Sequence, residues 1–159
     1  MRSVGSTGAV MAESVRLSAD PAGDYRLLEH TADMGIEARA ATLDALFIAA
    51  AHGLREMVFG SNCSAEPRQT LGVTLEGGDL EELLVAWLGE ILFIMEQERF
   101  CPAAFQIAEI DNRRLQGSVI GEPSREEQSP LREVKAVTYH RISIRRQQDG
   151  WRAEVYVDL

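Results

Sequence analysis

Three carboxylates and a histidine are the residues whose types and positions could support chemistry. His30 and Asp33 lie in a short connection between two predicted strands, where a turn alone needs no histidine. Asp158 is the penultimate residue, so its side chain lies next to the main-chain carboxylate of Leu159. If the last strand pairs beside the connection, these anionic groups converge. We interpret His30 as a hydrogen-bonding support for the turn rather than as a ligand.

The donor set indicates a hard cation. Asp33, Asp158 and Leu159 would offer only carboxylate oxygens, which favour Ca²⁺ or Mg²⁺ over softer metals, with Mn²⁺ as a further candidate. A structural explanation also fits the spacing. Asp33 would then cap a turn, and Asp158 would pair with Arg141 on a neighbouring strand. Spacing alone leaves both interpretations open.

The motifs of several enzyme classes are missing from the sequence. It has no GxSxG nucleophile elbow, no glycine-rich phosphate loop and no HExxH helix. A glycine pair precedes the second predicted helix, but Asp79 and the glutamates after it would repel a phosphate there. A metal-dependent hydrolase that uses Asp33, His30 and Asp158 remains an alternative, although the chain offers no recognisable nucleophile.

The composition indicates one globular domain without direct nucleic-acid binding. The chain has 159 residues, 45% of them hydrophobic, and a formal net charge of −9. Phosphate contacts need clustered Lys and Arg, so this charge favours cations or a basic protein partner instead.

Cys63 and Cys101 form no metal-binding spacing, and we expect two reduced thiols. No apolar run approaches the roughly 18 residues of a membrane span, and no secretory signal pattern is visible, so we expect a cytoplasmic protein of unknown oligomeric state.

Hydrophobic periodicity predicts an α+β fold. Residues 1–24 show no sustained pattern and are interpreted as a disordered leader, so that the domain covers residues 25–159. Two amphipathic helices are predicted after the N-caps Thr42 and Asp79. His52 lies off the apolar stripe of the first helix and is expected in solvent. Strands account for the rest, and we predict a single two-layer domain in which a largely antiparallel sheet packs against the two helices.

The last two strands are predicted to form a hairpin with a two-residue Asp149-Gly150 turn, its first strand running from residue 134 to residue 146. Alternation would put Lys135 on the face that carries Asp158, either as a solvated edge residue or as a cation near the carboxylates. The register would pair Ile144 with Val155, Ile142 with Val157, Arg145 with Glu154, Ser143 with Tyr156, and Arg141 with Asp158.

Six segments carry a further pattern. They are residues 30–36 (HTADMGI), the Thr42-Leu43, Leu46-Phe47 and Ala50 positions, the Leu83-Leu84 and Trp87-Leu88 positions, Gly121-Glu122, residues 134–140 (VKAVTYH), and the terminal Val155, Val157 and Asp158. Together, and in this order from residue 25 to the end, the segments resemble the archease family. The first and fifth segments are specific in combination.

This resemblance implies a protein cofactor rather than an enzyme. Members of the family activate an RtcB-type RNA ligase by promoting guanylylation of the ligase, which permits multiple turnover in tRNA splicing or RNA repair. The resemblance implies a metal site at Asp33, Asp158 and the carboxylate of Leu159. It also implies that Lys135 is needed for activation. A chaperone-like module for RNA-modifying enzymes is the alternative function.

Three places depart from the family pattern. Ala40 stands where a glycine is expected before the first helix. Leu159 replaces a terminal isoleucine but keeps the carboxylate. The loop after Glu122 has Arg125 and Ser129 where an aspartate and a histidine are expected, which leaves residues 122–133 without an implied role.

Overall fold

The computed structural model describes residues 23–29, 33–61 and 63–159. The predicted leader lies outside the described residues except for Gly23 and Asp24, which begin the first described strand. His30 also lies outside them. No described helix has the length and apolar character that a membrane span requires.

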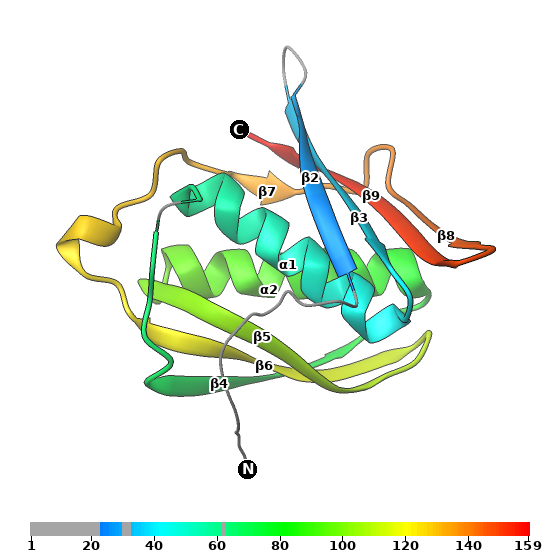
Figure 1. The fold of residues 1–159 in the computed structure, drawn as a ribbon, viewed down its shortest axis with the longest axis horizontal. Helices are drawn as coiled ribbons and strands as arrows, with labels where there is room; N and C mark the ends of the chain where they lie inside the picture. Colours follow the sequence, from blue (N-terminus) through cyan, green and yellow to red (C-terminus); the bar gives the residue numbers. More distant parts are fainter. Residues whose placement is uncertain (1–22, 30–32, 62) are drawn as a thin grey trace.

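Two antiparallel sheets form the framework (Figure 1). The larger sheet has the order β2-β3-β9-β7, and β8 pairs with the same strand β9. The smaller sheet has the order β4-β6-β5. The strands are β2 (Gly23–Glu29), β3 (Asp33–Ala40), β4 (Gln69–Glu76), β5 (Phe100–Ile110), β6 (Arg114–Pro123), β7 (Ala136–Val137), β8 (Ser143–Gln147) and β9 (Gly150–Asp158). A short 3₁₀ helix, η2 (Glu126–Gln128), follows β6.

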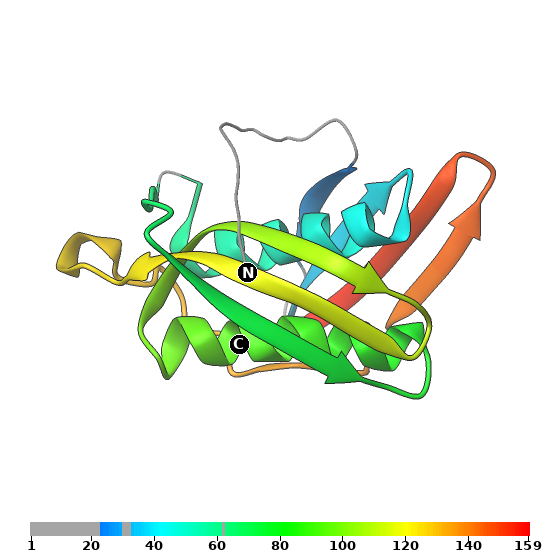
Figure 2. The same cartoon turned by 90° about the horizontal axis from the view of Figure 1, so that it is seen from below.

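The helices α1 (Leu43–Phe59) and α2 (Leu80–Glu96) lie between the two sheets, and each contacts strands of both (Figure 1). Figure 2 shows the smaller sheet lying across the helix pair. The core includes the fully buried Trp87, whose indole N–H donates to the carbonyl of Phe47 at 3.0 Å. The predicted α+β class, the antiparallel pairing and the two amphipathic helices are confirmed. The strands divide between two sheets because both helices have apolar residues around most of their circumference, which one sheet cannot cover.

Local sequence signals set the helix starts. The hydroxyl of Thr42 accepts from the N–H of Ala45 at 3.4 Å, and the carboxylate of Asp79 accepts from the N–H of Glu82 at 2.8 Å. The Glu82 carboxylate in turn reaches back to the N–H of Gly78. These side chains satisfy amide groups that the first helical turn leaves unpaired, so both predicted N-caps are confirmed.

The prediction for His52 is wrong. Its ring packs edge-on against Phe105 of β5, with ring centroids 5.0 Å apart. Burial, and next the charge of Arg55, lower the pKa of His52 to about 4. The helix lies between two sheets, so a position off the first apolar stripe still faces protein.

The predicted C-terminal hairpin is also wrong in register. Gln147 pairs with Gly150, so the turn is Gln148-Asp149. The partners of Ser143, Ile144 and Arg145 are displaced by two residues, and residues 141 and 142 lie outside the ladder. Gly150 has φ +139, and a Cβ there would lie 2.3 Å from the carbonyl oxygen of Ala40. A glycine is therefore needed because the chain passes close to β3 here, and not because of the turn.

The predicted long strand over residues 134–146 is two short strands, β7 and β8, which pair with the same edge of β9. The chain leaves the sheet between them, where Arg141 has φ +61. The guanidinium of Arg141 lies 5.0 Å above the ring centre of Tyr156. This cation–π contact replaces the predicted pairing of Arg141 with Asp158.

Candidate functional site

The sheet register brings the two predicted aspartates together. Asp33, the first residue of β3, is the direct cross-strand partner of Asp158, the last residue of β9. Directly opposed residues in an antiparallel pair lie on the same face with their Cβ atoms about 5 Å apart. Leu159 follows immediately, and the chain ends beside β2 and β3 (Figure 1). We call Asp33, Asp158 and the main-chain carboxylate of Leu159 the acidic tip.

The charges of the acidic tip are not neutralised within the described part of the chain. Neither Asp33 nor Asp158 forms an ion pair there, and Arg141, the partner expected for Asp158, stacks on Tyr156 instead. Like charges placed directly across a sheet destabilise it unless a cation lies between them. A donor set of carboxylate oxygens alone fits a hard divalent cation. Among the residues described, no three or more His, Cys, Asp or Glu side chains group in a way that could hold a metal, so the terminal carboxylate would have to complete the site.

Lys135 lies beside the acidic tip, but not as alternation predicts. The register places Ala136, rather than Lys135, directly opposite Asp158. The main-chain N–H of Lys135 donates to the main-chain carbonyl of Asp158 at 2.8 Å, and the side chain is exposed. The backbone of Lys135 is therefore fixed at the tip while its ammonium group stays accessible.

Gly35 and Tyr156 are buried next to the aspartates, and sequence reasoning missed them. They are direct partners on β3 and β9, one pair further along the sheet from the Asp33–Asp158 pair on the same face. A Cβ on Gly35 would lie 2.7 Å from the ring of Tyr156, so the ring lies against the glycine backbone. The sequence predicted Gly35 in the connection before the strand, whereas the structure includes it in β3, where a glycine often marks a close approach.

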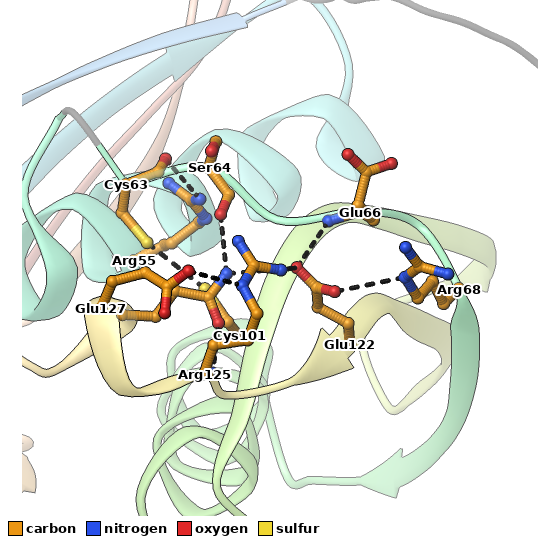
Figure 3. Close-up of polar contacts among 10 residues, drawn as sticks. Arg55, Cys63, Ser64, Glu66, Arg68, Cys101, Glu122, Arg125 and Glu127 are labelled. Atoms are coloured by element: carbon orange, nitrogen blue, oxygen red, sulfur yellow. Dashed lines mark hydrogen bonds and ion pairs between the residues drawn. The ribbon is translucent and has the colours of Figure 1, made fainter.

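A second cluster surrounds Glu122 at the end of β6 (Figure 3). Its side chain is buried and accepts from the N–H of Glu66 at 3.0 Å and from the amide of Gln128 at 3.1 Å. Arg125 and Arg68 also pair with it, Arg68 at 3.4 Å. The pKa of Glu122 is lowered, chiefly by the N–H of Glu66 and then by Gln128 and Arg125. We call these five residues the Glu122 network.

The Glu122 network gives the loop after β6 a structural role. The amide of Gln128 also donates to the carbonyl of Ser64 at 2.7 Å, and its oxygen accepts from the N–H of Arg125. The loop is thereby tied to residues 63–68, far away in sequence. Arg125, which departs from the family pattern, is one of the partners of Glu122.

A further buried carboxylate, Glu37, lies on the solvent face of the larger sheet. It is 4% exposed and pairs with Arg26 at 2.5 Å and with Arg152. The pKa of Glu37 is lowered, first by the hydrogen bond from Arg26 and then by Arg152. No sequence pattern predicted this cluster, because its members come from three different strands.

Comparisons with known proteins agree on the family. The family model described as the Archease protein family matches residues 25–159. Protein archease of Methanopyrus kandleri is 36% identical over 136 residues, covering 83% of this chain and 96% of the relative. Protein archease of Pyrobaculum islandicum is 34% identical over 141 residues, covering 86% and 95%. The solution structure of Methanobacterium thermoautotrophicum protein 1598 superposes with a TM-score of 0.72 at 30% identity, covering 85% of this chain and 98% of that one.

The α+β fold is thus shared with a solved structure, and this chain covers 95% or more of each of these relatives. This chain belongs to the archease family. Family membership supports an activator or accessory role for the protein.

Proposed function

We propose that this protein activates an RtcB-type RNA ligase by promoting guanylylation of the ligase, so that the ligase turns over repeatedly in tRNA splicing or RNA repair. The observation that carries the proposal is the acidic tip. Asp33 and Asp158 oppose each other directly, without an ion-pair partner among the described residues. A neutral or oppositely charged pair at these two positions would make the sheet more stable. The charge is therefore available to a ligand or partner.

Asp33, Asp158 and the carboxylate of Leu159 would hold a divalent cation of the Ca²⁺, Mg²⁺ or Mn²⁺ type. Such a cation supplies charge neutralisation for a nucleotide triphosphate. The contribution of this chain would be to hold the carboxylates in a fixed position. Two strands fix the aspartates, and the Gly35–Tyr156 contact holds those strands close below them. This rigid edge suits insertion into a partner's nucleotide site, where orientation lowers the barrier to attack by a histidine of the partner.

Lys135 complements this edge as the nearby exposed cation. Its backbone is bonded to Asp158, so any movement of β9 moves the lysine as well. The ammonium group can contact an anionic group of the ligase or its nucleotide while the carboxylates stay free for the metal. In this proposal the two charges act on the partner together, which explains why they occupy one end of one sheet.

Guanylylation of a purified RtcB-type ligase with GTP and substoichiometric amounts of this protein tests the proposal. We expect faster guanylylation with the natural chain and none of that acceleration with Asp158→Ala. Asp149→Ala is the matched control, because Asp149 is an exposed aspartate in the turn at the opposite end of β9. Full stimulation by a folded Asp158→Ala protein would contradict a role for the tip and favour a chaperone-like module. Hydrolysis of a phosphoester by this protein alone would favour the hydrolase alternative.

A further inference from the structure

Cys63 and Cys101 are brought together by the fold although 38 positions separate them in sequence. Their sulfur atoms lie 3.4 Å apart, and both are free thiols (Figure 3). Neither residue belongs to the acidic tip or is used in the proposed activation. The sequence predicted two unrelated reduced thiols, since no short cysteine spacing links them. We call these two residues the cysteine pair.

One arginine holds the backbone on both sides of the cysteine pair. Arg55 of α1 donates from Nη2 to the carbonyl of Cys63 at 2.9 Å, and from Nε to the carbonyl of Pro102 at 2.5 Å. Pro102 directly follows Cys101 in β5. A single planar guanidinium therefore bonds to both segments, which is the type of two-point recognition that arginine provides.

The two thiols differ in access. Cys63 is half-buried in residues 63–68, which form neither helix nor strand, whereas Cys101 is fully buried in β5. Burial, and then the hydrogen bond to Cys63, raise the pKa of the Cys101 thiol to about 12. Only Cys63 can meet a reagent from solvent, and only Cys101 is within reach of the sulfur of Cys63 afterwards.

We propose that the cysteine pair is a reversible thiol–disulfide site that reacts with low-molecular-weight disulfides such as glutathione disulfide. The thiolate of Cys63 attacks one sulfur of the oxidant, forming a mixed disulfide and releasing the first glutathione as a thiol. The sulfur of Cys101 then attacks the Cys63 sulfur, giving up its proton to solvent, and the second glutathione leaves as a thiol. Two cysteine thiols are oxidised and one glutathione disulfide is reduced to two glutathiones.

The geometry supports closure of this bond. A disulfide is about 2.05 Å long, so the sulfurs must approach by roughly 1.4 Å. Residues 63–68 can supply this movement because no strand ladder includes them. The bond would clamp this segment at Cys63, while Glu66 and Arg68 already bind Glu122. Oxidation would thus fix the segment to β5 and β6 from both ends.

Mass spectrometry of the full chain after incubation with glutathione disulfide tests this proposal. The natural protein should lose the mass of two hydrogens, lose both alkylatable thiols, give a peptide linked between Cys63 and Cys101, and revert with dithiothreitol. Its midpoint of thermal unfolding should be higher oxidised than reduced, by about 4 °C or more. Retention of both thiols, or stable glutathione adducts on the natural protein, would overturn the proposal.

Matched single variants test the order of attack. Cys101→Ala should accumulate one stable glutathione on Cys63, because no second thiol can displace it. Cys63→Ala should remain unmodified, because Cys101 is buried. Equal modification of the two folded variants would contradict the assigned roles. The experiment on the natural chain stands independently if a variant does not fold, and neither result depends on ligase activation.

Discussion

The Glu122 network and the acidic tip both contain carboxylates, but they differ in whether these carboxylates have positively charged partners. Glu122 is buried and surrounded by a backbone amide, a side-chain amide and two guanidinium groups. Asp33 and Asp158 stand opposite each other at a sheet end, without an ion pair in the described ranges. The first arrangement satisfies its charge within the fold, and the second pairs its charges with no cation among the described residues.

The comparison sets a carboxylate that stabilises the fold against a carboxylate pair that we propose to be functional. A buried charge that loses its donors pays the full cost of desolvation, so the Glu122 network must stay complete for the fold. A like-charge pair across a sheet opposes folding, so removing one member should not destabilise the chain. Stability measurements on matched variants can therefore separate the two regions without any partner protein.

The largest expected loss of stability is at Glu122. Glu122→Gln replaces an acceptor oxygen with an NH₂ group that faces other donors, so we expect a lower unfolding midpoint than for any substitution in the tip. Urea unfolding monitored by tryptophan fluorescence measures this, with Glu126→Gln in the same loop as the control because Glu126 is exposed. A Glu122→Gln protein as stable as that control would remove the contrast between the two regions.

The second expected effect is a loss of stability in acid caused by His52. Its folded pKa of about 4 lies below the ordinary value near 6.5, so the unfolded chain takes up the proton first. The contribution is complete above pH 6.5 and is lost as the pH falls towards 4. We expect the unfolding free energy to fall by about 2 kcal/mol between pH 7 and pH 5.

The variant His52→Gln separates the pH dependence caused by His52 from that caused by Glu122. Its unfolding free energy should change much less over the same pH interval, whatever its absolute stability. The lowered pKa of Glu122 means that its own contribution is present above the ordinary carboxyl pKa and lost only at lower pH. An unchanged slope in His52→Gln would assign the acid sensitivity to other groups.

A smaller effect of opposite sign is expected at the acidic tip. Asp33→Asn removes the repulsion with Asp158 and should raise the unfolding free energy in chelator by about 0.5 kcal/mol. We expect Ca²⁺, Mg²⁺ or Mn²⁺ to raise the unfolding midpoint of the natural protein but not that of this variant. Thermal unfolding with and without each cation tests both parts, with Asp149→Asn as control. A cation-induced rise that persists in Asp33→Asn would argue against the proposed ligand set.

The smallest change in stability is expected at Lys135. Its side chain is exposed, so Lys135→Gln should alter the unfolding free energy by no more than about 0.5 kcal/mol. Stimulation of the ligase should nevertheless fall, while the cation-induced shift stays. Normal stimulation by this variant would restrict the functional charge to the carboxylates.

Local signals in the sequence predicted both helices, whereas the meeting of Asp33 with Asp158 was one of two interpretations that the spacing left open. The caps Thr42 and Asp79 act within a few residues, so short-range patterns find them. The aspartates were found because each lies at an end of a strand, and one pairing of those strands brings them together. Hydrophobic periodicity and chain order carry this type of information.

Other contacts between distant segments could not be predicted from the sequence. Gly150 suggested a hairpin turn, but its conformation is set by the carbonyl of Ala40 on another strand. The Glu122 network and the cysteine pair both depend on residues 63–68 lying across β5 and β6, for which no short motif exists. Lys135 was assigned the wrong face because residues 138–142 leave the sheet, which interrupts the alternation that the prediction assumed.

Strand β9 is the last strand in chain order, yet it lies inside the larger sheet, with β3 on one edge and β7 and β8 on the other. During synthesis from the N-terminus, β2 and β3 therefore present an unpaired edge until nearly the whole domain has been made. Such long-range pairing slows folding and exposes the waiting edge to other chains. Delayed closure would favour chaperone contact with nascent chains, and destabilising β9 should promote aggregation before it impairs any other property.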